Sequence, residues 1–166
     1  MVRRDELRTG ERAVEALPSP NAGVVFIGRI STPWTDRLSC PRQGRLDGPV
    51  CRIEVFAPWA PDALDGIEGY ERLEVLYWLH QSRRDIIRQS PADEGTARGV
   101  FSLCSLVRPN PIGTSIVQLI GHEESTLLVQ GLDCLDETPL LDIRPDRSGF
   151  TPIALRQAGD DKIAGS

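Results

Sequence analysis

A proline-rich hexapeptide, RPNPIG at residues 108–113, contains the residue types best suited to hold a ligand. Pro109 and Pro111 fix the backbone φ on either side of Asn110, and Gly113 permits an unusual turn. Such a stiff loop can present its backbone groups and the Asn110 amide to a bound molecule. The same residues also suit a rigid connection between two strands, and taken alone they favour that structural interpretation.

Further polar residues could contact a ligand from two other segments. Arg42 stands between Pro41 and Gln43 in a polar loop, and a guanidinium group is well shaped to bind a carboxylate or phosphate. His80 ends an apolar run and is followed by Gln81. Each residue has a structural alternative, because most loop arginines are solvated and many strand-end histidines have an internal partner.

Charged residues near the C-terminal end have similar alternatives. Asp142 and Arg144 are two positions apart in an apolar run, so strand alternation puts them on one face and predicts an ion pair, within the chain or at an interface. Asp136 precedes Glu137, Thr138 and Pro139, where an aspartate commonly caps a turn.

Several common catalytic and binding motifs are missing from the sequence. No two glycines are separated by one residue, which excludes the GxGxxG dinucleotide fingerprint. There is no Walker A motif, HExxH motif or GxSxG elbow, and two histidines cannot build a histidine-rich metal centre. The four cysteines form no CxxC pair, so we expect free thiols and no metal site.

Composition and charge indicate a globular protein that is not a generic nucleic-acid binder. The 166 residues carry a formal charge of −5, whereas proteins that make many phosphate contacts usually have a basic surface. No apolar run approaches the length of a membrane helix, and the polar N-terminus does not resemble a signal peptide. We therefore expect a cytoplasmic protein that does not contact membranes.

Short apolar runs separated by turn residues predict a mainly β, single-domain barrel or sandwich. Residues 1–21 are interpreted as an N-terminal extension, 22–152 as the barrel domain and 153–166 as a tail. A short amphipathic helix is expected at 3–17 and helical turns at 61–67, while 82–97 is expected to be loop with a helical turn at 85–88. Strands are predicted at 24–30, 51–56, 73–79, 99–103, 114–120, 126–130 and 140–144.

The hexapeptide resembles the RPNPIG signature of the TsaA/TrmO (YaeB-like) family, and other family motifs occur in the expected order. Together these segments cover residues 24–150, nearly the whole predicted core. The matching segments are IGRISTP at 27–33, PRQ at 41–43, LDGIEGY at 64–70, HQ at 80–81, GVF at 99–101 and LDCLDETPLLDIRP at 132–145.

The resemblance implies an S-adenosylmethionine-dependent methyltransferase built on a partly open β-barrel, usually a homodimer. Family members that act on tRNA methylate N6 of a threonylcarbamoyl-modified adenosine beside the anticodon. Such a reaction rests on in-line positioning and an acceptor for the N–H, for which Asn110 is the catalytic candidate. The cofactor-binding residues implied by the motifs are Pro41, Arg42, Gln43, His80, Gln81, Cys104, Arg108, Pro111, Thr114, Asp136, Glu137, Thr138 and Pro139.

Four positions depart from the family pattern. Cys104 replaces a usual arginine, Thr114 a leucine or methionine, Glu137 the glycine of a DGTP turn, and Asp146 an aromatic residue. Cys104, Glu137 and the negative charge favour an alternative function, a non-catalytic S-adenosylmethionine-binding or regulatory protein that kept the family pocket, whereas the intact PRQ and RPNPIG loops favour the methyltransferase. A barrel dimer that binds a different adenine-containing ligand is a further alternative.

A basic cleft would favour tRNA as the partner, because an acidic protein needs a local site that receives phosphates. The arginines that could form such a cleft are Arg83, Arg84, Arg88 and Arg98. If these side chains point apart or pair with acidic residues, the argument for tRNA loses this support.

Overall fold

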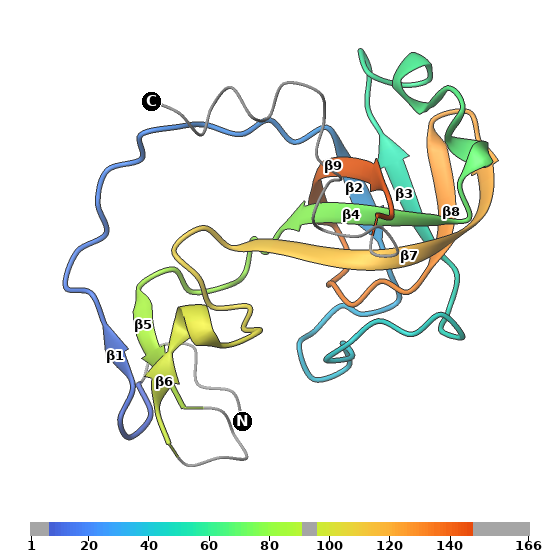
Figure 1. Ribbon diagram of the computed structural model, residues 1–166. Helices are drawn as coiled ribbons and strands as arrows, with labels where there is room; N and C mark the ends of the chain where they lie inside the picture. The colour runs from blue at the N-terminus through green and yellow to red at the C-terminus, as the bar shows by residue number, and fades with distance from the viewer. Residues whose placement is uncertain (1–6, 91–95, 148–166) are drawn as a thin grey trace, which may run out of the picture.

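The computed structural model describes residues 7–90 and 96–147, and its main feature is a six-stranded antiparallel barrel (Figure 1). The strand order is β2-β3-β8-β7-β4-β9, and β9 pairs with both β4 and β2. The expected mainly β barrel is thus confirmed, although it is closed rather than partly open. Its strands are β2 (Gly28–Ser31), β3 (Cys51–Val55), β4 (Arg72–Trp78), β7 (Ile112–Glu123), β8 (Thr126–Gln130) and β9 (Thr138–Pro145).

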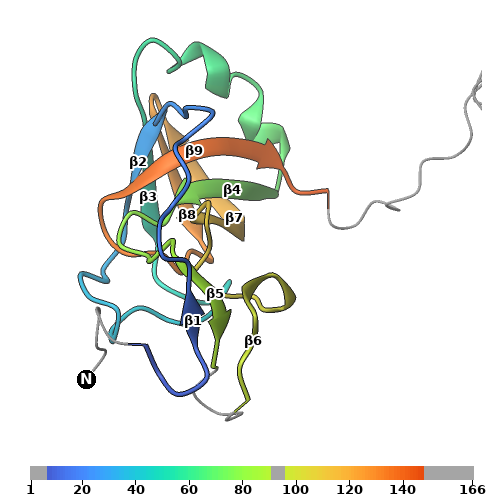
Figure 2. The same ribbon diagram turned by 90° about the vertical axis from the view of Figure 1, so that its left-hand side faces the viewer.

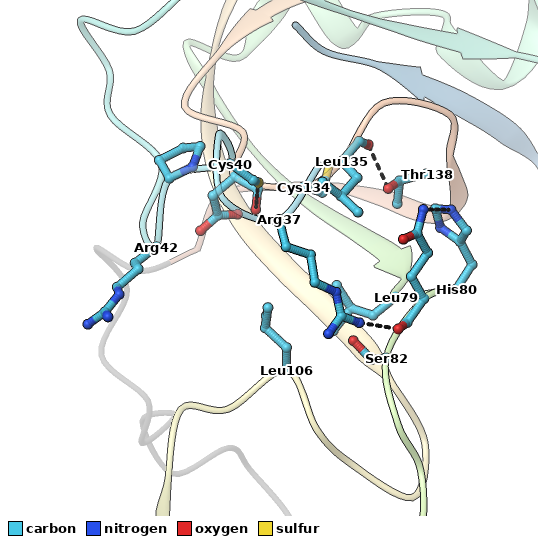
Figure 3. A pocket seen from close by; sticks show the side chains of 13 residues that line it. Arg37, Cys40, Arg42, Leu79, His80, Ser82, Leu106, Cys134, Leu135 and Thr138 are labelled. Carbon is cyan, nitrogen blue, oxygen red and sulfur yellow. Dashed lines mark hydrogen bonds between the residues drawn. The ribbon is translucent and has the colours of Figure 1, made fainter. Parts of the chain in front are cut away.

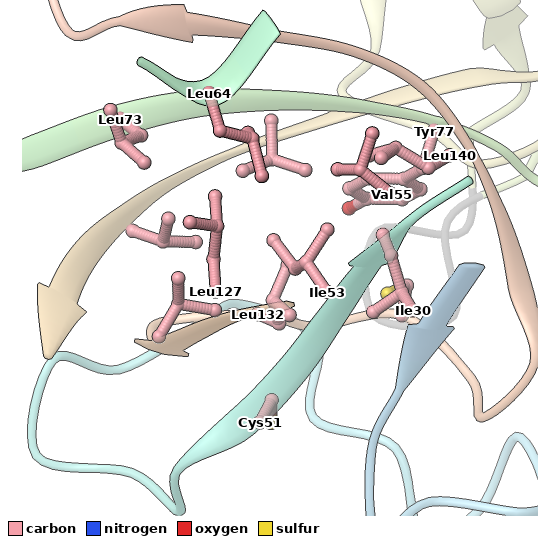
Figure 4. Close-up of a cluster of buried hydrophobic side chains, with 14 residues drawn as sticks. Ile30, Cys51, Ile53, Val55, Leu64, Leu73, Tyr77, Leu127, Leu132 and Leu140 are labelled. Atoms are coloured by element: carbon pink, nitrogen blue, oxygen red, sulfur yellow. The ribbon is translucent and has the colours of Figure 1, made fainter. Parts of the chain in front are cut away.

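Alternating side chains fill the interior of this barrel (Figure 4). In β4, Leu73, Val75 and Tyr77 are buried, while the residues between them are only partly covered. Strands β3 and β8 show the same period of two, so each strand contributes one apolar face to a common core. The interior is therefore a packed core, and a ligand site must lie at an end or on the surface of the barrel.

A second, smaller sheet lies beside the barrel (Figures 1 and 2). It consists of β1 (Arg12–Ala13), β5 (Ile86–Gln89) and β6 (Arg98–Gly99) in the order β1-β5-β6. Ile86 and Val100 are buried, the latter in the 3-10 helix η3 (Val100–Ser102) that follows β6. Two of its strands, β5 and β6, come from the chain between β4 and β7, and β1 comes from the N-terminal side of the barrel.

Most of the predicted elements agree with the structure. The strands predicted at 51–56, 73–79, 114–120, 126–130 and 140–144 correspond to β3, β4, β7, β8 and β9. The predicted helical turns are the 3-10 helices η1 (Asp62–Leu64) and η2 (Ile67–Gly69). The predicted ion pair is also present, with Arg144 Nε 2.7 Å from Asp142 Oδ2.

The predictions fail mainly in the small sheet. The described part of the expected helix at 3–17 instead contains β1, because Gly10 turns the chain at φ 81° and Val14 N–H donates to the Asp85 carbonyl. The expected loop at 82–97 contains β5, and the strand expected at 99–103 is largely η3. The strand expected at 24–30 begins only at Gly28. A short segment with a weak hydrophobic pattern forms a strand when a neighbouring strand is available to pair with it.

No helix in the described ranges 7–90 and 96–147 is long and apolar enough to cross a membrane.

Gly113 of the RPNPIG loop serves a close contact inside the barrel wall. It pairs with Tyr77 across β7 and β4, and a Cβ added to it would lie 2.3 Å from Cε2 of the Tyr77 ring. The residue lies within β7, so the expected unusual turn is not the reason for this glycine. Its missing side chain leaves the space that the tyrosine ring occupies.

We expect Gly113→Ala to destabilise the protein by about 1–3 kcal/mol, because the added methyl group forces the buried Tyr77 ring to move. The free energy of unfolding from urea titration measures the effect. Gly99→Ala is the matched control, since nothing lies within 4 Å of its Cβ position, and it should change stability by less than about 0.5 kcal/mol. Equal stability of both variants would contradict the proposed ring contact.

Candidate functional site

A pocket lies at one end of the barrel, where four chain segments meet (Figure 3). They are the loop between β2 and β3, the residues after β4, the segment before β7 and the turn between β8 and β9. In an antiparallel barrel these connections all emerge at the same end. The lining residues are Arg37, Cys40, Pro41, Arg42, Leu79, His80, Gln81, Ser82, Leu106, Asp133, Cys134, Leu135 and Thr138.

Apolar groups and neutral thiols make up most of the pocket wall. Leu79, Leu106 and Leu135 contribute aliphatic side chains from three of the segments. Burial and then the charge of Asp133 raise the pKa of Cys40 to about 11, and the same causes raise the pKa of Cys134. Both thiols are therefore protonated at neutral pH, so they act as apolar wall groups rather than as nucleophiles.

Asp133 is the acidic residue of this wall, and three donors hold it in place. Its Oδ1 accepts hydrogen bonds from the Tyr77 hydroxyl at 2.8 Å and the Ser115 hydroxyl at 2.6 Å. Its Oδ2 accepts a hydrogen bond from the Gly44 N–H at 3.1 Å. Burial and then the charge of Asp133 raise the pKa of Tyr77, which therefore remains a neutral donor. The carboxylate is thus fixed at the boundary between core and pocket.

Two arginines lie at the pocket, but their side chains point in different directions (Figure 3). The Arg37 guanidinium extends across the pocket and donates a hydrogen bond to the Gln81 carbonyl. The exposed Arg42 side chain points away from the other labelled residues. Arg37 is therefore the better placed of the two to contact a ligand inside the pocket.

The residues that the family motifs suggest for the cofactor divide into two groups. Pro41, Arg42, His80, Gln81 and Thr138 line the pocket. The other positions lie outside its lining, and most of them have structural contacts. These are Gln43, Cys104, Arg108, Asn110, Pro111, Thr114, Asp136, Glu137 and Pro139.

The RPNPIG loop supports the pocket wall from behind. The Pro111 carbonyl accepts a hydrogen bond from the Leu79 N–H at 2.7 Å, which fixes a wall residue. The Arg108 guanidinium turns back to the Leu103 and Ser105 carbonyls. Asn110 is exposed next to this loop's buried proline. The loop is thus a stiff connection that fixes a residue of the pocket wall.

The turn between β8 and β9 also has internal contacts. Asp136 Oδ1 accepts a hydrogen bond from the Thr32 N–H at 3.0 Å, so its side chain ties this turn to the segment after β2 instead of making the expected local cap. Glu137 has a φ of 60°, in the left-handed region where glycine is favoured. Its carboxylate lies 3.1 Å from Arg29, so this side chain gains a surface ion pair.

Two other departures from the family pattern are also explained by local contacts. The Thr114 hydroxyl donates to Glu74 Oε1 at 3.2 Å on the outside of the barrel. Asp146 pairs with Arg72 at 2.9 Å, and its side chain is 8% exposed. Both replacements therefore affect the barrel wall, away from the pocket lining.

Sequence reasoning missed several residues of the pocket. Asp133 lies inside the LDCLDETP segment, but only its hydrogen bonds with Tyr77 and Ser115 distinguish it from other turn aspartates. Arg37 and Leu106 come from segments with no periodic pattern, so the sequence held no signal for them. Within the described residues, no group of three or more histidine, cysteine or acidic side chains could hold a metal ion.

Known proteins with similar sequences cover most of this chain. A protein of Rhizobium radiobacter named a probable S-adenosyl-L-methionine-binding protein, VirR, is 55% identical over 148 residues, which is 89% of this chain and 84% of that protein. The tRNA (adenine(37)-N6)-methyltransferase of Escherichia coli K12 is 38% identical over 130 residues, 72% of this chain and 55% of that protein.

Solved structures and a family description agree with these relatives. A crystal structure of TrmO from Pseudomonas aeruginosa is 30% identical with a TM-score of 0.66 and covers 88% of this chain. This chain spans 64% of that solved chain, so it matches less than two thirds of its length. The family described as tRNA-methyltransferase O N-terminal domain matches residues 29–149. The barrel, its motifs and these matches together show that the chain belongs to the tRNA-methyltransferase O (TrmO) family.

Proposed function

We propose that this chain binds S-adenosylmethionine in the pocket at the barrel end and transfers its methyl group to N6 of a modified adenosine near the tRNA anticodon. The observation that carries the proposal is the pocket itself. It combines apolar walls, a guanidinium at one side and a carboxylate at another, within the segment that matches the family. The relatives named as S-adenosylmethionine-binding proteins and as a tRNA methyltransferase support it.

The groups present in the pocket fit the chemistry of this cofactor. An adenine ring and methylene groups need apolar surface, which Leu79, Leu106 and Leu135 supply. A carboxylate needs a cationic donor, and Arg37 lies across the pocket. A positive sulfur and an amino group need acceptors or negative charge, which Asp133 provides. These residues would hold the cofactor.

When bound, the cofactor would supply a methyl group already activated on a positive sulfur. The protein's contribution is then to exclude water, fix the methyl group in line with the acceptor nitrogen and accept a hydrogen bond from that nitrogen. Asn110 has an amide oxygen suited to the last role and lies in the loop that holds Leu79. No strong base is required for this chemistry.

The arginines considered for a phosphate-binding cleft mostly serve the fold. Arg83 pairs with Asp85 at 2.6 Å. Arg84 donates to the Pro109 carbonyl and lies over the Trp78 ring at 5.6 Å, and Arg88 donates to the Ala97 carbonyl. The support for tRNA therefore comes from the relatives rather than from this set of arginines.

A second candidate function is a non-catalytic S-adenosylmethionine-binding or regulatory protein. It is favoured by the 55% identical relative, whose name states binding without transfer, and by Cys104 in place of the family arginine. A homodimer remains a prediction from the family resemblance, and a cytoplasmic location remains a prediction from the sequence.

Titration calorimetry with S-adenosylmethionine tests the cofactor proposal. We expect one binding site per chain and an affinity about tenfold weaker in Arg37→Ala, because a charge-assisted hydrogen bond is lost. Arg42→Ala is the matched control and should lose less than about threefold, because its exposed side chain lies at the pocket edge and points away from the other labelled residues. An absence of saturable binding at millimolar cofactor would overturn the cofactor proposal.

Transfer of a labelled methyl group tests the acceptor. We expect label in tRNA that carries threonylcarbamoyl-adenosine and none in the same tRNA without that modification. Asn110→Ala should lower kcat by about tenfold or more with little change in cofactor affinity, since its amide would act only on the reacting nitrogen. Cofactor binding without any transfer to the modified tRNA would contradict this acceptor and favour the binding-only function.

A further inference from the structure

The Asp133 carboxylate has features that its structural contacts do not account for. Its side chain is half-buried, lines the pocket and receives three hydrogen bonds, from Tyr77, Ser115 and the Gly44 N–H. A carboxylate offers about four lone-pair sites, so Oδ2, which among the described residues accepts a hydrogen bond only from the Gly44 N–H, retains acceptor capacity. All three donors are neutral groups.

The negative charge of Asp133 has no cationic partner among the described residues. No arginine, lysine or histidine in the described ranges forms an ion pair with it, although arginines occupy the same pocket. Its influence on neighbouring groups is visible, because its charge adds to burial in raising the pKa of Tyr77, Cys40 and Cys134. A half-buried charge whose hydrogen-bond donors are all neutral is costly unless a positive group completes the site.

The other groups around this carboxylate do not supply that positive charge. The hydroxyls of Tyr77 and Ser115 lie behind it in the barrel, and the thiols of Cys40 and Cys134 flank it in the wall. Leu79 and Leu135 add apolar surface to a wall that also contains Arg37, and apolar surface weakens dielectric screening and strengthens the field of a single charge. The pocket is thus prepared for a ligand with a positive charge.

We propose that Asp133 recognises the positive sulfur of the bound cofactor and makes the pocket prefer S-adenosylmethionine over its demethylated product, S-adenosylhomocysteine. This inference rests on the proposed cofactor and names the residue that distinguishes substrate from product. Methyl transfer forms the bond from the acceptor nitrogen to carbon, leaves the electron pair of the broken carbon–sulfur bond on sulfur and releases a proton from the acceptor. The ligand therefore loses its charge at sulfur, and Asp133 loses its partner.

S-adenosylmethionine and S-adenosylhomocysteine share the same amino acid group. A comparison of the two therefore distinguishes a contact of Asp133 with the sulfur from a contact with the ammonium group. If Asp133 held the ammonium group instead, removing its charge would weaken both ligands equally. Sinefungin, which has an amine-bearing carbon in place of the methylated sulfur, provides a stable cationic ligand with the same adenosine. S-adenosylmethionine and sinefungin carry a positive charge at that position by different chemistry, and S-adenosylhomocysteine carries none, so a loss that the two cations share and the neutral ligand lacks reports the charge.

Titration calorimetry with all three ligands tests the proposal on the wild-type chain, Asp133→Asn and Ser115→Ala. In Asp133→Asn, we expect affinity for S-adenosylmethionine and sinefungin to fall about tenfold and affinity for S-adenosylhomocysteine to change less than about twofold. Ser115→Ala removes the hydrogen bonds of Ser115 with Asp133 and Tyr77 but keeps the carboxylate, so the ratio of affinities should match that of the wild type. Circular dichroism and urea unfolding establish that each variant is folded.

The proposal would be overturned if Asp133→Asn lowered the affinity for all three ligands by the same factor, or if it changed none of the three affinities. If that variant fails to fold, the wild type decides the matter, because equal affinities for sinefungin and S-adenosylhomocysteine would also overturn it. A wild-type chain that binds none of the ligands refutes the proposed cofactor itself. If the wild-type chain binds all three ligands without preference, only the role of Asp133 is refuted.

Discussion

The buried contact of Tyr77 with Ser115 and Asp133 joins the barrel core to its pocket. A buried tyrosine hydroxyl without a partner would cost free energy, and here both hydroxyls donate to the same carboxylate oxygen. The ring that carries this hydroxyl fits only because Gly113 has no side chain. Core packing, the RPNPIG glycine and the position of a pocket carboxylate therefore depend on one another.

Many residues of the family motifs have contacts that shape the frame of the pocket. The RPNPIG loop holds Leu79 through the Pro111 carbonyl, and Arg108 closes the preceding segment on itself. Glu137 keeps the left-handed backbone of a turn where the family has glycine, with an ion pair to Arg29. A motif can recur in a family because its backbone geometry positions other residues that contact the ligand.

The pocket has an uneven distribution of charge that suits a small ligand with separated charges. Arg37 extends across the pocket from the loop after β2, while Asp133 is fixed against the barrel core. Between them the wall is aliphatic, and the thiols of Cys40 and Cys134 stay neutral. In such an apolar setting each charge acts with little screening, so single residues can determine which ligand is preferred.

The sequence by itself determined the barrel class, most of its strands and part of the pocket lining, including His80 and Thr138. The alternation of apolar and polar residues and the ordered motifs are local signals, so they can be recognised in the sequence alone. Only the tertiary structure decided that the barrel closes, that β1, β5 and β6 build a small sheet and that Arg37 and Asp133 share one pocket. Those features depend on contacts between residues far apart in the chain, which no local pattern encodes.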